Sequence, residues 1–232
     1  MKFKKRGRRP PRRREPEEKP IWYPKTKLGK KVLAGDYSSL EEILKRGEVI
    51  LESGIIDTLI PDIKQEIIYI GGSPGKGGGI RRTATKRTVR MHKSGRRFKL
   101  TAVAAVGDGK GVVGVGKASS KEHRTALEKA TLKAKLNMIR VRKGCGSWEC
   151  ACGGTHSIPF KTEAKYGSVR VVLTPGPKGL GLVANPTGRK ILGLAGISDL
   201  WVKTFGNTGT RMNLVYAIVE ALKNLNRIKG AL

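Results

Sequence analysis

Three cysteines and one histidine lie within one twelve-residue stretch, Cys145, Cys150, Cys152 and His156, and the rest of the chain has no cysteine. Three thiolates and one imidazole form a complete tetrahedral ligand set for Zn²⁺, with no position left open for a substrate. The glycines around them, at 144, 146, 153 and 154, allow the chain to turn tightly. The stretch therefore predicts a structural zinc site.

The same four residues are also compatible with two alternatives that involve no metal. The spacings of five, two and four residues differ from the paired Cys-x-x-Cys spacing of zinc knuckles. The three thiols could be free beside an incidental histidine, or two of them could form a disulfide, as in some thermophile proteins. An odd, clustered set does not suggest a secreted disulfide scaffold.

Two glycine patterns resemble phosphate-binding loops. Gly109, Gly111 and Gly114 match a dinucleotide fingerprint, and Gly111 with Gly116-Lys117 matches most of a Walker loop. The residue that must present a hydroxyl to magnesium is Ala118, and valines alternate through the loop as in a strand. We therefore expect these glycines to serve a hairpin and the close approach of an RNA backbone.

No catalytic constellation is visible. The histidines are His92, His123 and His156, and no serine, histidine and carboxylate converge in the sequence; Asp108 and Asp199 lie in turn or capping contexts. Aromatic residues make up 5% of the chain, too few for a base-stacking sheet, and Phe98 is expected in the core. We predict a protein that is not an enzyme and that contacts RNA through shape and phosphates.

The net charge points to a polyanionic partner. Of 232 residues, 48 are Lys or Arg and 18 are Asp or Glu, which gives +30. Self-repulsion of this size favours binding to nucleic acid. An anionic membrane surface is the alternative, but no run of about 18 apolar residues could span a bilayer. No apolar signal-peptide core is present, so we expect a cytoplasmic protein.

The central stretch, 95–138, predicts two strands and a helix. Apolar residues alternate from Phe98 to Val106, a Gly-Asp-Gly turn follows, and Val112–Val115 form the returning strand. Ser119 and Glu122 are spaced as a capping box, with a helix after them. That helix has an alanine stripe and a basic face over 121–135, which includes Lys129 and Lys133.

Basic residues concentrate in two further segments. Nine of the first fourteen residues are basic and prolines interrupt them, which indicates a disordered arm that orders on RNA. The glycine-rich run 71–79 leads into a basic loop, 81–97, interpreted as an RNA-contacting hairpin. The predicted RNA-binding residues are Arg12, Arg13, Arg81, Arg82, Lys86, Arg87, Arg90, Lys93, Arg96, Arg97, Lys110, Lys117, Lys121 and Arg124.

The remaining segments complete an α+β pattern. Residues 22–29 suggest an extended segment with aromatic anchors, Ser38 or Ser39 caps a short helix ended by Gly47, and 55–60 suggests another helical turn. A strand is expected at 66–70. After residue 156 we expect strands at 157–162, 169–173, 180–184 and 200–205, and helices at 189–195 and 212–225.

The run from Gly95 through Phe98, Leu100 and Ala102 to Val106-Gly107-Asp108-Gly109, and on to Gly116-Lys117, resembles the family of the fifth protein of the small ribosomal subunit. Ser168–Val171, Gly179–Ala184 and Leu194–Asp199 are similar to its C-terminal domain, and Thr26–Gly29 with Ile55–Asp57 to the extension of its archaeal and eukaryotic members.

The resemblance implies a double-stranded-RNA-binding-like domain followed by a C-terminal α/β sandwich. It also implies a ribosomal location near the decoding region and the path by which messenger RNA enters, with an influence on accuracy. The expected partners are small-subunit ribosomal RNA, messenger RNA, and the fourth and eighth small-subunit proteins; no membrane partner is expected. The fourth protein is expected to contact Lys161, Thr162, Lys165, Tyr166 and Arg170.

The resulting division of the chain is a basic arm, an archaeal-type extension, the RNA-binding-like domain, a linker with the Cys/His cluster, and the C-terminal domain. Their expected bounds are 1–20, 21–62, 63–140, 141–156 and 157–232. A free double-stranded-RNA-binding regulator and a phosphate-loop NTPase are the competing functions.

Overall fold

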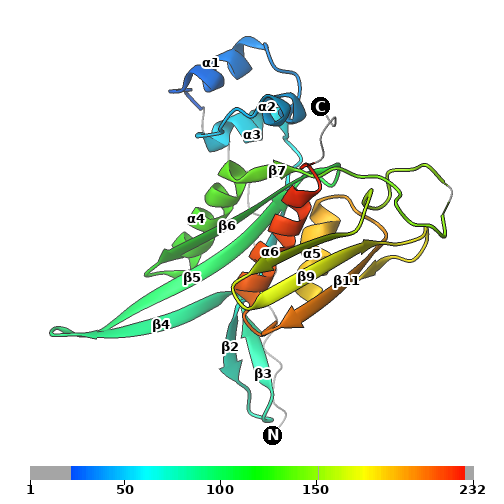
Figure 1. Ribbon diagram of the computed structural model, residues 1–232. Coiled ribbons are helices and arrows are strands. Elements are labelled where there is room, and N and C mark those ends of the chain that lie inside the picture. The colour runs from blue at the N-terminus through cyan, green and yellow to red at the C-terminus, as the bar shows by residue number, and fades with distance from the viewer. Residues whose placement is uncertain (1–21, 151, 228–232) are drawn as a thin grey trace, which may run out of the picture.

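A computed structural model describes residues 22–150 and 152–227, so the predicted basic arm, with Arg12 and Arg13, lies outside the described residues. The first half of the chain builds a five-stranded antiparallel sheet in the order β1-β5-β6-β7, with β4 also paired to β5 (Figure 1). Its strands are β1 (Lys64–Ile68), β4 (Thr85–His92), β5 (Gly95–Gly107), β6 (Val112–Ser120) and β7 (Met138–Arg140). Helix α4 (His123–Leu136) packs against β5 and β6.

The predicted turn between β5 and β6 is confirmed. Asp108 Oδ1 accepts hydrogen bonds from the backbone amides of Lys110, Gly111 and Val112 at 2.7, 3.1 and 3.0 Å. Gly109 and Gly111 have φ of 73° and 147°, which other residues rarely adopt. Asp108 thus has the structural role expected for it.

The predicted capping box at the start of α4 is wrong. Ser119 is still in β6, paired with Thr101, because the β5–β6 ladder continues to Ser120. Glu122 occupies the N-cap position, and its side chain accepts a hydrogen bond from the Thr125 hydroxyl rather than a backbone amide. Pairing in the sheet therefore places Ser119 in β6, although its side chain could have capped the helix.

Helix α4 lies unusually close to the sheet because β6 presents glycines to it. A Cβ on Gly116 would lie 2.2 Å from Ala134 N and 2.3 Å from Ala130 O, and one on Gly114 would lie 2.2 Å from Ala134 O. Ala126, Ala130 and Ala134 form the buried helix stripe, as predicted. These two glycines therefore make room for the helix, and not for an RNA backbone as expected from the sequence.

Three short helices form the N-terminal extension and lie together beyond one end of the sheet (Figure 1). They are α1 (Lys27–Ala34), α2 (Leu40–Arg46) and α3 (Ser53–Leu59). Gly47 ends α2 with φ of 73°, as predicted. The extended segment expected over 22–29 stops at Thr26, whose hydroxyl accepts from Gly29 N and begins α1, a helix that the sequence had not indicated.

Two hairpins project from the first sheet. The glycine-rich segment forms a small one from β2 (Gly71–Pro74) and β3 (Ile80–Thr83). The basic segment forms a long one, because β4 pairs with the first half of β5 from Thr85↔Ala102 to His92↔Gly95. The expected basic loop is thus a regular two-stranded arm (Figure 1).

The second half of the chain forms a four-stranded sheet in the order β10-β11-β9-β8 with two helices. Its elements are β8 (Thr162–Tyr166), β9 (Val169–Pro175), β10 (Leu182–Val183), α5 (Pro186–Leu194), β11 (Leu200–Gly206) and α6 (Arg211–Asn224). The strand expected at 157–162 is wrong: Ser157 makes only an isolated bridge to Gly144, and pairing with β9 begins at Thr162. The strand expected at 180–184 shrinks to two residues.

The two sheets share one hydrophobic core. Val103 and Val113 of the first sheet belong to the same buried cluster as Leu173 of β9, Leu194 of α5 and Ile218 of α6. The Gly109 amide donates to Leu194 O at 2.9 Å, so the β5–β6 turn also contacts the end of α5. The architecture is α+β, as the sequence predicted.

Candidate nucleic-acid interface and metal centre

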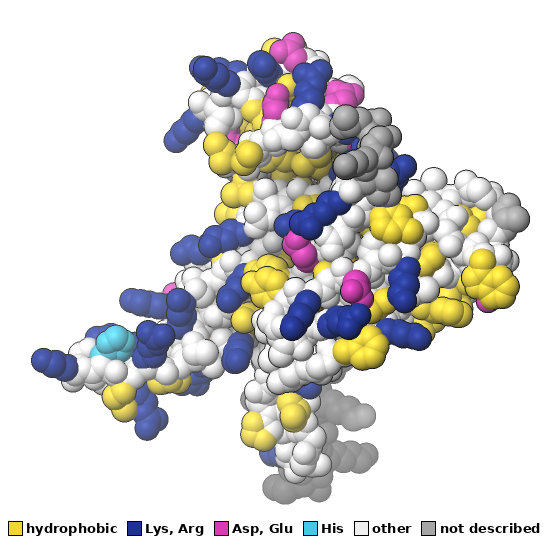
Figure 2. Space-filling model, in the orientation of Figure 1, with side chains coloured by type: hydrophobic (Ala, Val, Ile, Leu, Met, Phe, Trp, Pro, Cys, Tyr) yellow, Lys and Arg dark blue, Asp and Glu magenta, His cyan; other side chains and the backbone are white. Residues whose placement is uncertain are grey.

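The predicted RNA-binding residues within the described part of the chain are all solvent-exposed. They are Arg81, Arg82, Lys86, Arg87, Arg90, Lys93, Arg96, Arg97, Lys110, Lys117, Lys121 and Arg124. Figure 2 shows Lys and Arg side chains along the whole projecting β4–β5 arm. The fold therefore presents these charges to solvent on elements that extend from the body.

The β4–β5 register sorts the arm into two faces. Arg90 lies directly opposite Arg97, and Lys99 lies opposite Thr88, so these cations share one face with Lys86. Like charges directly across a strand pair repel each other, and a phosphate backbone would relieve that repulsion. Lys99 is a member that sequence reasoning missed, although its period-two spacing from Arg97 was a usable signal.

The other face of the arm corrects the expectation for Phe98. Phe98 is 41% exposed, not in the core, and the Arg87 guanidinium carbon lies 3.8 Å from its ring centroid. Phe98 lines an open cavity together with Thr125 and Lys129 of α4, so the helix borders the ring without burying it. The contact is a cation–π pair on an exposed ribbon.

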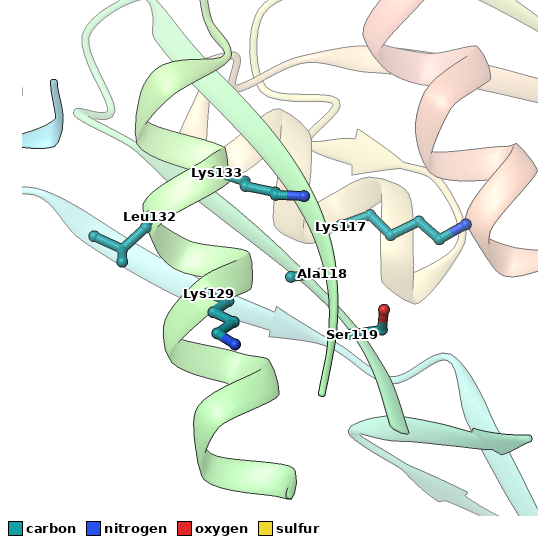
Figure 3. A pocket seen from close by; sticks show the side chains of 6 residues that line it. All are labelled: Lys117, Ala118, Ser119, Lys129, Leu132 and Lys133. Carbon is teal, nitrogen blue, oxygen red and sulfur yellow. The ribbon is translucent and has the colours of Figure 1, made fainter. Parts of the chain in front are cut away.

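A cationic groove runs between β6 and α4. A hollow of about 440 Å³ is lined by Lys117, Ala118 and Ser119 of β6 and by Lys129, Leu132 and Lys133 of α4. Figure 3 shows these six side chains. A neighbouring cavity of about 630 Å³ includes Phe98, Lys99 and Lys121. Together the two hollows connect the base of the arm to the basic face of α4.

The predicted protein-contact residues divide between the two faces of the second sheet. Lys161, Lys165 and Arg170 are exposed, and Lys165 pairs across the ladder with Arg170. Thr162 is buried, and the Tyr166 ring packs against Tyr216 of α6 at 5.1 Å. The outer face also carries exposed Trp201 and Phe205.

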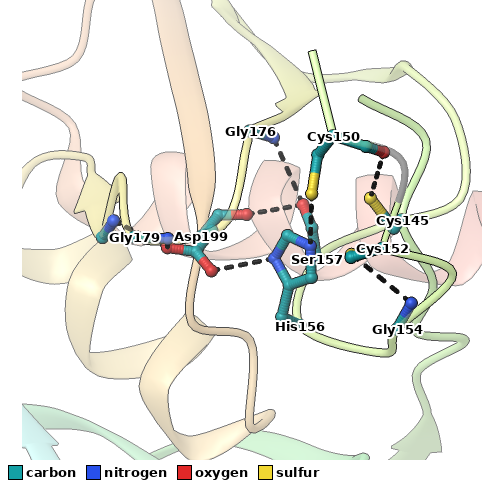
Figure 4. A network of polar contacts seen from close by, with 10 residues as sticks. Cys145, Cys150, Cys152, Gly154, His156, Ser157, Gly176, Gly179 and Asp199 are labelled. Carbon is teal, nitrogen blue, oxygen red and sulfur yellow. Dashed lines mark hydrogen bonds and ion pairs between the residues drawn. The ribbon is translucent and has the colours of Figure 1, made fainter. Parts of the chain in front are cut away.

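The four predicted metal ligands meet in one place. One ligand atom each of Cys145, Cys150, Cys152 and His156 lies within 4.8 Å of every other, and the three thiols are free (Figure 4). Cys150 Sγ and His156 Nε2 are 3.8 Å apart. A tetrahedral Zn²⁺ with ordinary Zn–S and Zn–N bonds requires about 3.6 Å between such atoms, so the donor set and its spacing fit zinc.

The loop that carries these ligands is closed at its base by backbone pairing. Gly144 N donates to Ser157 O at 2.9 Å, Ser157 N returns a bond to Gly144 O at 3.0 Å, and Gly146 N donates to Ile158 O. A Cβ on Gly146 would lie 2.0 Å from Pro159 O, so only glycine allows this approach. The four ligands thus lie in a compact loop on the second half of the molecule.

The thiols of Cys145 and Cys150 have different acidities. The Lys178 backbone amide, with further hydrogen bonds from Cys152 and His156, lowers the pKa of Cys150 to about 6, whereas burial raises the pKa of Cys145. A thiolate is the form that binds metal, so Cys150 is prepared for ligation near neutral pH.

The carboxylate of Asp199, 43 residues after His156 in the sequence, lies beside the cluster. Asp199 Oδ2 lies 2.8 Å from His156 Nδ1, and the buried Ser157 hydroxyl donates to Asp199 O at 2.5 Å (Figure 4). Serine, histidine and carboxylate therefore do converge, contrary to expectation. The Ser157 hydroxyl contacts a backbone carbonyl and Gly176 N instead of the imidazole, so this is not a nucleophile–base pair.

Two family models match the chain. Residues 81–142 match "Ribosomal protein S5, N-terminal domain" and residues 164–231 match "Ribosomal protein S5, C-terminal domain". A small ribosomal subunit protein uS5 from Methanocorpusculum labreanum is 45% identical over 212 residues, which cover 91% of this chain and 96% of the relative. The chain belongs to the ribosomal protein S5 family.

Further archaeal members of the S5 family show the same extent of similarity. The uS5 protein of Nanoarchaeum equitans is 46% identical over 90% of this chain and 89% of its own length, and that of Methanocaldococcus jannaschii 45% over 88% of each. The similarity thus extends well beyond the two matched domains. It bears out the expected archaeal type.

Membership in the S5 family settles the broad function. The chain is a structural constituent of the small ribosomal subunit in the cytoplasm, binds ribosomal RNA and other ribosomal proteins, and is not an enzyme. Within the part of the chain that the structure describes, none of the helices is long and apolar enough to cross a membrane.

Proposed function

We propose that this S5 protein holds ribosomal RNA helices near the decoding region by neutralising their phosphates, and thereby contributes to subunit assembly and translational accuracy. The observation that carries the proposal is the β4–β5 arm, where Arg90 and Arg97 face each other without an acidic partner among the described residues. Such an arm gains most from a polyanion, and Lys129 and Lys133 of α4 add a second cationic surface on the other side of the sheet.

The experiment measures binding of the full chain to small-subunit ribosomal RNA as a function of salt. Arg90→Gln with Arg97→Gln should weaken binding and make the slope of log K against log[salt] shallower by about one to two units, because each lost phosphate contact releases one counterion fewer. Reversing Arg96 and Arg97 should act in the same direction. The control is Lys30→Gln with Lys31→Gln, which removes the same charge from exposed positions in α1.

An unchanged slope in the arm variant would count against a phosphate role for the arm. An equal change in the control would mean that net charge, not the arm, determines binding. In cells, the wild-type chain should sediment with the small subunit and leave that peak only when RNA is digested.

We propose further that the fourth small-subunit protein contacts the outer face of the second sheet through Lys161, Lys165 and Arg170, and that the eighth protein also binds this half. Supporting this, the face combines exposed cations with Trp201 and Phe205. Thr162 and Tyr166 are left out because they lie on the helix side of the sheet. Lys165→Glu with Arg170→Glu should reduce binding to the purified fourth protein and leave RNA affinity nearly unchanged.

Messenger RNA near its path of entrance is the remaining proposed partner.

We also propose that the Cys/His cluster binds one structural Zn²⁺. Four ligands would saturate the ion, so it would hold the loop 144–157 closed and supply no reactive position. Elemental analysis should find one zinc per chain, and a strong chelator should lower the melting temperature. Absence of stoichiometric zinc together with an unchanged melting temperature would refute this site.

A further inference from the structure

Asp199 lies at the junction between the cluster and the second sheet. The residue directly precedes β11, and its side chain is 7% exposed. One carboxylate oxygen, Oδ2, contacts His156 Nδ1 at 2.8 Å. The other, Oδ1, accepts from the backbone amides of Gly179 and Gly181 at 3.1 and 2.8 Å.

This geometry selects one tautomer of the histidine. An ionised carboxylate can only accept hydrogen bonds, so the proton of a neutral imidazole must reside on Nδ1. The lone pair is then on Nε2, the nitrogen that faces Cys150 Sγ inside the thiol cluster. A ligating histidine needs that arrangement, with its other nitrogen donating to an oriented acceptor.

The same carboxylate reaches the turn between β9 and β10. Residues 175–181 form that turn, and its Gly179 and Gly181 amides both donate to Asp199 Oδ1. Gly179 and Gly181 have φ of 92° and 74°, so the turn has little freedom to be rebuilt by other residues.

We propose that Asp199 is the positioning residue of the metal centre: it sets His156 to ligate through Nε2 and joins the loop 144–157 to the turn 175–181. This inference rests on the proposed zinc site. Removal of the metal would then loosen two segments that residues 158–174 separate in the sequence.

The test uses the full chain and Zn²⁺ affinity measured by competition with a chelating dye. Asp199→Asn keeps an oxygen that can accept from Gly179 and Gly181, but places an N–H donor against His156 Nδ1, which favours the wrong tautomer. We expect zinc affinity to fall about 10- to 100-fold. The control Asp108→Asn alters a similar turn-holding carboxylate in the first half of the molecule and should leave zinc affinity unchanged.

A second background separates positioning from general support of the fold. A cysteine ligand has no tautomer, so in His156→Cys protein the further change Asp199→Asn should alter zinc affinity less than about threefold, because only the imidazole depends on its partner for a lone pair. Equal losses in both backgrounds would overturn the proposal, since Asp199 would then act on the fold alone.

Nitrogen NMR of the metal-free chain gives an independent readout. His156 should carry its proton on Nδ1 in the wild type and on Nε2 in the Asp199→Asn variant. Wild-type protein that binds zinc while the variant binds it equally well refutes this inference alone. Wild-type protein that binds no zinc refutes both the site and the inference.

Discussion

Glycines in the central hairpin have two distinct physical roles. Gly109 and Gly111 are needed for their backbone conformation in the turn. Gly114 and Gly116 are in ordinary strand conformation and are needed because α4 leaves no space for a Cβ. Glycine is thus required for the conformation of the turn at the first two positions, and for the packing of a helix at the other two.

Gly116→Ala should destabilise the protein by about 1–3 kcal/mol, since the new methyl group would force α4 away from β6. Chemical denaturation measures the effect. Gly193→Ala in α5 is the matched control, because a Cβ there meets nothing within 4 Å and the backbone is helical. The control should be neutral or stabilise by up to about 1 kcal/mol. Equal destabilisation by both changes would contradict this account of the β6–α4 contact.

At the scale of elements, α4 joins the sheet to the N-terminal extension. Lys135 of α4 forms an ion pair with Asp57 of α3 at 2.5 Å, and the Lys135 side chain is only 12% exposed. The Arg124–Glu128 pair on the same helix is largely exposed. The first pair therefore lies in an environment where an unmatched charge is costly, and the second does not.

Asp57→Asn should cost about 1 kcal/mol of folding free energy, because it leaves the ammonium of the largely covered Lys135 side chain without its counter-charge. Glu128→Gln breaks the exposed pair and should cost less than about 0.5 kcal/mol. Thermal unfolding of both variants provides the comparison. A loss at Glu128 as large as that at Asp57 would show that burial does not govern these pairs.

At the scale of the whole molecule, the two family-matched segments share one core. Leu194 is buried between the halves, and its carbonyl accepts from Gly109 in the first half. The division at residues 141–156 that we propose from the sequence therefore separates two sheets that bury each other. Such a contact favours cooperative unfolding.

Calorimetry of the free chain should show a single unfolding transition for the two sheets. Leu194→Ala should destabilise the protein by about 2–5 kcal/mol, through the cavity it creates. Hydrogen exchange in β5 and in β9 should accelerate by the same factor. Two resolved transitions, or faster exchange in β9 alone, would establish that the halves fold independently.

The sequence by itself determined the features that depend on residues a few positions apart and on the overall composition and charge. Asp108 and its glycines specify the turn through amides two to four residues away, and Gly47 ends α2 within one turn of helix. Charge pointed to RNA, and the clustered cysteines with His156 pointed to a metal, because these inferences need only residue types and short spacings.

Only the tertiary structure decided which distant segments approach each other. The tertiary structure leaves Phe98 outside the core and pairs Ser119 in the β5–β6 ladder instead of at a helix cap. It packs α4 against Gly116. It also brought Asp199 to His156 across 43 residues of chain. A sequence read in short windows contains no record of such approaches, because packing between segments, and not the chemistry of neighbours, fixes those distances.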